Sequence, residues 1–222
     1  MTGLFGVLRR EALLEWRRPG RWSSLVFFSA AVVLLVAFAS PSEAALREQA
    51  GGTFWVAILL ASTRAVDQAW QVDLENGALE ALVLWPVEPA VLFYAKVLAL
   101  TATLTTVALA TGPLILGMYD APLRGDVGTL LLLLVTGCAG LAAPATLLGA
   151  MTAQARGASV LLPLLLFPLV VPALLAAAKG TSVLLEGDPM GQAPAWLGIL
   201  VTFTALHWSL GGLLFGRIVE DG

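Results

Sequence analysis

Long uncharged stretches dominate the chain, and the short segments between them carry its charges. An α-helix rises about 1.5 Å per residue, so about 20 apolar residues cross the roughly 30 Å hydrocarbon core of a bilayer. Five uncharged stretches are long enough to do so: residues 22–42, 97–119, 127–155, 157–178 and 189–216. The pattern therefore predicts an all-α integral membrane protein with five clear transmembrane helices.

A sixth uncharged stretch, residues 49–63, has only 15 residues, and a run of this length can be re-entrant instead of spanning. The charges decide between these alternatives, because cytoplasmic loops carry an excess of lysine and arginine. Six spans with a cytoplasmic N-terminus place nine of these residues inside and three outside, whereas five spans place seven inside and five outside. We therefore expect six spans in one membrane domain (residues 1–222), with both termini in the cytoplasm. The expected bounds are about 22–42, 49–66, 92–119, 127–153, 157–178 and 193–216.

Residues 2–18 have the pattern of a helix that lies along the membrane surface. Apolar side chains gather on one side, five arginines precede Trp22, and Pro19-Gly20 breaks the helix before the first span. The alternative is a basic segment that only sets the orientation of the chain. The apolar run that follows is too long for the core of a cleavable signal peptide, so we expect it to stay in the mature protein.

The segment between the second and third expected spans is acidic and amphipathic. Leucines recur between its acids at close to helical spacing. A carboxylate at the centre of a transmembrane helix costs about 2.5 to 3.5 kcal/mol, so this segment does not cross the bilayer. We expect residues 67–88 to form a cytoplasmic hairpin that docks a partner, because an anionic leaflet repels acids and disfavours the alternative, a helix resting on the headgroups. The acids are Asp67, Asp73, Glu75, Glu80 and Glu88. Arg64 can snorkel or pair with Asp67, which lengthens the usable second span.

Proline is frequent inside the expected spans. Pro163, Pro168 and Pro172 all lie in the fifth span. Each removes a helical hydrogen bond, so we expect a bent or broken helix there. Structural kinking alone explains the three prolines, and a hinge for alternating access is the alternative. Small residues crowd the fourth span, which favours close packing of helices.

Composition and charge exclude several classes of function. Hydrophobic residues make up 59% of the chain and charged residues 12%, which is unlike a soluble domain. The net charge of −3 offers no basic surface for nucleic acid. His207 is the only histidine, so one chain cannot build a metal site of several imidazoles. We expect His207 to hydrogen-bond a neighbouring helix, and haem ligation is the alternative.

Motifs for catalysis are absent from the sequence. No Walker A sequence occurs, so this chain does not hold ATP by that route. The expected spans contain no acid apart from Asp67 at one end, which counts against a proton-coupled carrier. We therefore expect a transporter subunit that has no catalytic residues and binds no metal or cofactor itself.

Residues 73–86 (DLENGALEALVLWP) resemble the acid–x–Gly–small–Leu–Glu–x–Leu–x–x–x–Pro segment of ABC type-two exporter permeases, which packs against the ATPase subunit. Within that superfamily the chain is most similar to the CcmB family, the haem-exporter permeases of cytochrome c maturation. The similarity rests on a length near 220 with six spans, on Arg9-Arg10-Glu11 with Trp16-Arg17-Arg18, on Ala95-Lys96-Val97 after the acidic segment, and on the proline-rich residues 161–172. The chain departs from the pattern at Asn76-Gly77-Ala78, where Asp-Gly-Ser or Asp-Gly-Thr is expected, and at Trp85.

The resemblance implies a permease that couples ATP hydrolysis in a partner subunit to haem export, or to release of a haem-loaded chaperone. It implies a homodimer over two CcmA-like ATP-binding subunits, with CcmC-like and CcmD-like membrane subunits and a CcmE-like haem chaperone, in the cytoplasmic (inner) membrane. ATP belongs to the partner subunit and haem to the complex. The docking residues expected on the hairpin are Asp73, Glu75, Gly77, Leu79, Glu80 and Leu82.

Three alternatives stay open at this point. One is the permease of another ABC exporter, for drugs, lipids or polysaccharide. A second is an ion-coupled secondary carrier without an ATPase, and a third is a non-transporting scaffold subunit of a membrane complex. Co-purification with an ATPase separates the first from the second, and c-type cytochrome phenotypes separate the CcmB family from other ABC permeases.

Overall fold

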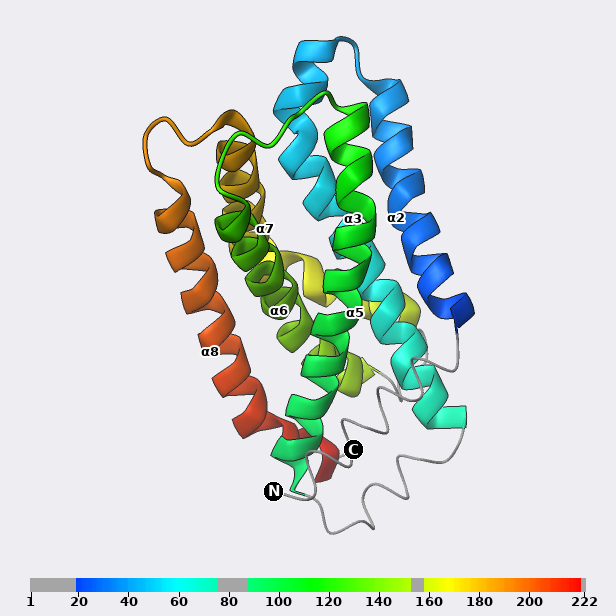
Figure 1. Cartoon of the computed structure of the whole chain (residues 1–222). Helices are drawn as coiled ribbons and strands as arrows, with labels where there is room; N and C mark the ends of the chain where they lie inside the picture. Colours follow the sequence, from blue (N-terminus) through cyan, green and yellow to red (C-terminus); the bar gives the residue numbers. More distant parts are fainter. Residues whose placement is uncertain (1–18, 76–87, 153–157, 221–222) are drawn as a thin grey trace.

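The computed structural model describes residues 19–75, 88–152 and 158–220, and within these residues the chain is helical, without strands. Six helices pack side by side (Figure 1). They are α2 (Pro19–Ala39), α3 (Glu43–Glu75), α5 (Pro89–Met118), α6 (Val127–Thr152), α7 (Ala158–Glu186) and α8 (Ala193–Glu220). The expected all-α fold is confirmed for this part of the chain.

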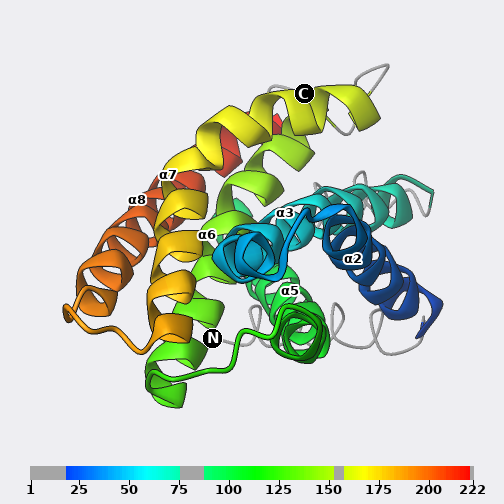
Figure 2. The same cartoon turned by 90° about the horizontal axis from the view of Figure 1, so that it is seen from above.

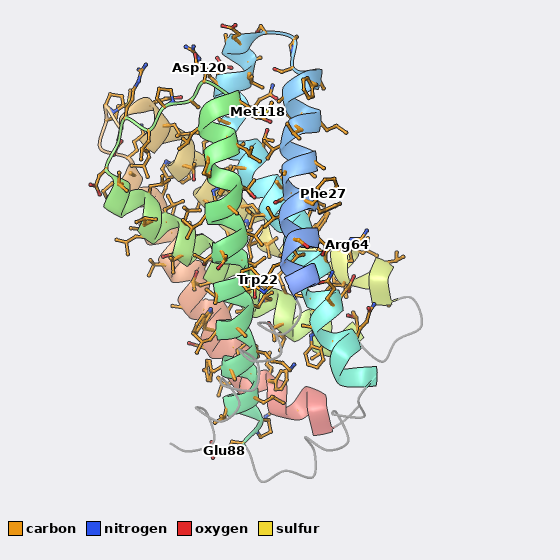
Figure 3. The ribbon with its side chains drawn as sticks, turned by 45° about the vertical axis from the view of Figure 1, so that its right-hand side comes forward. Trp22, Phe27, Arg64, Glu88, Met118 and Asp120 are labelled. Atoms are coloured by element: carbon orange, nitrogen blue, oxygen red, sulfur yellow. The ribbon has the colours of Figure 1, made fainter. Side chains whose placement is uncertain are left out.

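Consecutive helices alternate in direction along the bundle (Figure 1). Residues 40–42, 119–126 and 187–192 connect helices at one end, which we call the loop end. At the other end α3 finishes and α5 begins, and we call this the α3–α5 end. Met118 and Asp120 lie at the loop end in Figure 3, and Glu88 lies at the α3–α5 end.

Five helices have the length and apolar composition to cross a bilayer: α2, α5, α6, α7 and α8. The chain is accordingly a multi-pass membrane protein. The remaining described helix, α3, is 33 residues long but carries charged residues near both ends. It packs against α2, α5, α6 and α7, and in Figure 2 it lies among its neighbours near the centre of the bundle.

The side chains in the middle of α3 are almost all buried. Residues 53–55, 57–59 and 61–63 are buried. Each of these groups is followed by one side chain that is less covered, and these three side chains, Val56, Leu60 and Arg64, form a narrow strip. These three residues are four apart, so they share one side of the helix. Protein therefore surrounds this stretch of α3 on its other sides, and its composition can be more polar than that of a helix exposed to lipid.

Several helix bounds differ from those expected. α3 begins at Glu43 and ends at Glu75, so it includes residues before the expected second span and the first arm of the expected hairpin. α7 continues to Glu186, eight residues past the expected end at 178. Hydropathy marks where a helix leaves the hydrocarbon region, whereas the helix itself continues for as long as its backbone hydrogen bonds do. The expected surface helix at 2–18 and hairpin residues 76–87 lie outside the described residues.

Helix α7, which corresponds to the expected fifth span, is bent but unbroken. Pro163, Pro168 and Pro172 all lie inside its continuous range. Figure 2 shows its first part (yellow) running across the bundle, at a large angle to its second part (orange). Sharp kinks in helices occur at proline, which accounts for the expected bend.

Two indole rings of α3 pack against glycines of α6. Gly137 lies against the ring of Trp55, and Gly149 lies against Trp70. The Trp55 Nε1 also donates a hydrogen bond to the Thr181 hydroxyl of α7 at 2.9 Å, so this side chain joins three helices. The close packing expected from the small residues of the fourth span is confirmed at these two positions.

Polar contacts hold the helices together at the loop end. Arg47 of α3 forms an ion pair with Asp120, which follows α5. The Tyr119 hydroxyl donates to the Val33 carbonyl of α2 at 2.9 Å, and the Gly125 amide donates to the Leu184 carbonyl of α7 at 2.8 Å. These contacts tie four helices to one another at the loop end.

Candidate functional site

The candidate site is the α3–α5 end, because the expected docking segment leaves α3 there and enters α5. Asp73 and Glu75 lie in the last turn of α3, and nothing is described of their side chains. The other expected docking residues, Gly77, Leu79, Glu80 and Leu82, lie outside the described residues. The structure therefore defines the two helices that carry the segment.

A buried lysine faces an indole ring between these two helices. Lys96 of α5 is 7% exposed and Trp70 of α3 is 6% exposed. The Lys96 Nζ lies 4.6 Å from the centroid of the Trp70 ring. A cation over an indole face is worth about 2 kcal/mol or more when the pair is shielded from water. This contact joins α3 to α5 directly beside the docking segment.

The burial of Lys96 was not expected from the sequence, in which Lys96 counted as one of the nine inside charges and as part of Ala95-Lys96-Val97. Helical spacing offered a signal, because residues four apart lie on one side of a helix. Leu92 and Leu100 flank Lys96 at this spacing, and both are buried. Lys96 therefore lies on the packed side of α5, where its methylene stem is covered by protein.

Trp70 also packs closely against α6. A methyl group added at Gly149 would come within 2.5 Å of both the Trp70 Nε1 and the Val66 Cγ1, so only glycine permits this approach. A cavity of about 40 Å³ adjoins the lysine and the indole ring. Its lining residues are Leu25, Ala65, Val66, Ala69, Trp70, Lys96, Ala99, Leu100, Thr103 and Thr146. By volume it has room for about one or two water molecules.

Arg64 lies on the same half of α3 and connects it to α2. Its side chain is exposed, and the guanidinium carbon lies 5.6 Å from the centroid of the Phe28 ring of α2. Figure 3 shows Arg64 beside α2. The charge of Arg64 also acts on the Asp67 carboxyl one turn later. Arg64 therefore adds a contact between α3 and α2 near the charged end of α3.

Among the residues that the structure describes, His207 bonds its own helix and not a neighbouring one, which differs from the expectation. Its Nδ1 lies 2.9 Å from the Phe203 carbonyl of its own helix, α8, and its ring stacks on that of Phe203 with centroids 3.9 Å apart. The bonds to the neighbouring helix come from Thr204 and Trp208, which donate to the carbonyls of Thr136 and Ala139 on α6. An imidazole one turn after a carbonyl can form its hydrogen bond within its own helix. The longer indole of Trp208 then makes the hydrogen bond to the neighbouring helix.

The other expected site residues lie apart from the α3–α5 contact. Pro163, Pro168 and Pro172 belong to α7; Pro168 and Pro172 are exposed and Pro163 is half-buried. Among residues 19–75, 88–152 and 158–220, no group of three or more His, Cys, Asp or Glu side chains is arranged to hold a metal ion. The candidate site thus consists of two helices, a buried cation–indole contact and the segment that joins the helices.

Comparison with known proteins identifies the family of this chain. Residues 2–219 match the model of a family described as CcmB protein. Heme exporter protein B of Pseudomonas aeruginosa is 32% identical over 212 residues, which cover 95% of this chain and 93% of that protein. Heme exporter protein B of Rhodobacter capsulatus is 29% identical over 174 residues, with 78% and 79% covered. The protein of the same name from Bradyrhizobium diazoefficiens is 25% identical over 195 residues, with 87% of each chain covered. The chain therefore belongs to the CcmB protein family.

Proposed function

We propose that this chain is the membrane permease subunit of an ABC transporter complex for cytochrome c maturation, and that it couples ATP hydrolysis by a partner subunit to haem export or to release of a haem-loaded chaperone. The observation that carries the proposal is the family match over residues 2–219. The relatives' name, Heme exporter protein B, and the five long apolar helices support it.

The same proposal assigns ATP hydrolysis to a separate, CcmA-like subunit. The sequence contains no Walker A motif. The docking element is the segment 67–88, with Asp73, Glu75, Gly77, Leu79, Glu80 and Leu82 as its contact residues. The position of this segment between α3 and α5 supports the assignment, because a push on it acts on two packed helices at once.

The proposed complex contains two copies of this chain over two ATP-binding subunits. CcmC-like and CcmD-like membrane subunits and a CcmE-like haem chaperone complete it. We place the complex in the cytoplasmic (inner) membrane, with the α3–α5 end and both termini in the cytoplasm. The excess of arginine and lysine on that side supports this orientation.

We further propose that α3 also spans the membrane, which brings the number of transmembrane helices to six. At 33 residues it is longer than the about 20 that a span requires. Its burial among α2, α5, α6 and α7 supports this, because a helix covered by protein does not need an apolar surface all round. Its first turn then lies on the outer side, where Arg47 pairs with Asp120.

The function is tested by complementation in a bacterium that lacks its own permease of this family. Expression of this chain, together with its CcmA-like ATPase subunit, should restore c-type cytochromes. Replacement of the Walker A lysine in that ATPase should abolish the restoration, which a secondary carrier would not require. Full c-type cytochrome levels with the inactive ATPase would contradict the proposal.

Single cysteines should establish the topology. Placed at Glu43 or Glu186, which are exposed at the loop end, they should react with an impermeant maleimide in intact cells. A cysteine at Glu88 should react only after the cells are opened, because α3 carries the chain back to the cytoplasm. The native Cys138 is buried, and Cys138→Ala removes any background. Labelling at Glu88 in intact cells would show that α3 does not span.

Replacing His207 by glutamine should leave c-type cytochrome levels close to normal. The imidazole bonds only locally to Phe203 in the structure, and glutamine keeps a polar group of similar reach. The measurement is haem staining of c-type cytochromes in complementing cells, with protein abundance determined alongside. Loss of c-type cytochromes at normal abundance would instead assign His207 a direct part in haem handling.

A further inference from the structure

The contact between Lys96 and Trp70 closes the helical frame on which the docking segment is mounted. Trp70 lies in α3 five residues before its end at Glu75, and Lys96 lies in α5 seven residues after its start at Pro89. Residues 76–87 connect these two helix ends. The contact therefore lies directly across the base of the segment, between its two arms.

The surroundings of this contact restrain both partners. The Trp70 ring lies against Gly149 of α6 and has the Lys96 Nζ over its face. Lys96 is 7% exposed, so its charge has been moved out of bulk solvent and gains more from the indole than an exposed lysine would. The cavity of about 40 Å³ lies beside the pair, so packing on that side is incomplete, and the cation–indole contact adds to the attachment of α3 to α5 there.

We propose that Lys96 and Trp70 form a clamp that makes α3 and α5 move as one unit when the ATPase subunit displaces the docking segment. This proposal rests on the proposed function, in which that segment transmits the ATPase movement. Both are positioning residues, because neither is one of the residues proposed to contact the ATPase. Without the clamp, displacement of the segment would separate α3 from α5 instead of moving the bundle.

A distance measurement in the permease alone tests the clamp. Spin labels on Gln71→Cys and Glu88→Cys, both exposed and on opposite arms, report the separation of α3 and α5 in a Cys138→Ala background in lipid nanodiscs. Lys96→Met keeps the stem and removes the charge, and we expect it to broaden the distance distribution. Lys96→Arg keeps a cation and should preserve the parent distribution. Lys179→Met makes the same chemical change at an exposed position of α7 and should have no effect.

Trp70 gives an independent pair of variants if Lys96→Met fails to fold. Trp70→Phe keeps an aromatic face and should stay close to the parent, whereas Trp70→Leu should broaden the distribution. Unchanged distances in both Lys96→Met and Trp70→Leu would overturn the clamp. The same holds if Lys96→Arg broadens the distribution as much as Lys96→Met does.

A second measurement, in the complex with the ATPase subunit, reads out coupling. Lys96→Met should leave co-purification and ATP hydrolysis at parent levels while c-type cytochrome formed per ATP hydrolysed falls about tenfold, with recovery in Lys96→Arg. Normal output in Lys96→Met would overturn the role in coupling. If the parent permease binds no ATPase at all, the proposed function fails, and the distance measurement still decides whether the clamp exists.

Discussion

A permease with both Leu79→Asp and Glu80→Lys should lose its ATPase partner. A segment with acids and apolar anchors is suited to a groove with basic and apolar walls, and the double change removes an anchor and introduces charge repulsion. Central anchors of this kind are often worth more than about 2 kcal/mol each, so we expect affinity to fall by about a hundredfold or more. The measurement is detergent pull-down of the ATPase by the tagged permease, with ATP hydrolysis determined on the same sample.

The matched control makes both chemical changes at the other end of the molecule. Val127 and Glu186 are exposed at the loop end, so Val127→Asp with Glu186→Lys repeats the loss of an apolar side chain and the charge reversal there. This control should retain the ATPase at parent level. Undiminished co-purification by the Leu79→Asp, Glu80→Lys variant would remove the docking assignment and reopen the secondary-carrier interpretation.

The sequence was most informative where the chain meets lipid. Five spans followed from uncharged length alone, because hydrocarbon imposes one simple requirement on every helix that it surrounds. The bend in α7 followed from Pro163, Pro168 and Pro172 for an equally local reason, the loss of helical hydrogen bonds. These features depend on residues close together in the chain.

Features that depend on distant residues could not be predicted in the same way. The central place of α3 is not encoded in α3 itself, since it depends on which helices cover it. Lys96 was counted among the cytoplasmic charges, and its contact with Trp70, on a different helix, helps to explain why it is tolerated at 7% exposure. The pairing of Trp55 with Gly137 likewise joins residues far apart in the sequence.

The error for His207 is the opposite one. A hydrogen-bond partner was available in its own helix, whereas a partner in a neighbouring helix was expected. A ring nitrogen one helical turn after a carbonyl can bond it directly, as it does to Phe203. The expectation of a bond to a neighbouring helix overlooked this. The adjacent Trp208 makes that bond instead, because its Nε1 reaches the Ala139 carbonyl at 3.0 Å.

Replacing Gly137 by alanine should destabilise the permease, and more than the same replacement at Gly128 or Gly140, the glycines of α6 where an added Cβ meets neither Trp55 nor Trp70. The new Cβ would lie 2.8 Å from two carbons of the Trp55 ring, closer than real contacts allow. The ring cannot turn aside without losing its hydrogen bond to Thr181, so α6 must move away from α3. Overpacking of this kind costs about 1 to 3 kcal/mol, and we expect the melting temperature in detergent to fall by about 2 to 12 °C.

Two neighbouring glycines of α3 provide the internal comparison for this effect. A Cβ at Gly51 would come within 2.7 Å of the Ala178 carbonyl oxygen of α7, whereas one at Gly52 meets nothing within 4 Å. Gly51→Ala should therefore lower the melting temperature as Gly137→Ala does. Gly52→Ala should leave it unchanged or raise it, because alanine favours the helix by about 1 kcal/mol over glycine. Equal melting temperatures for Gly51→Ala and Gly52→Ala would show that close approach of α3 to its neighbours does not hold the bundle together. If the temperatures differ as expected, the steric fit around α3 is what fixes this polar helix at the centre of an apolar bundle.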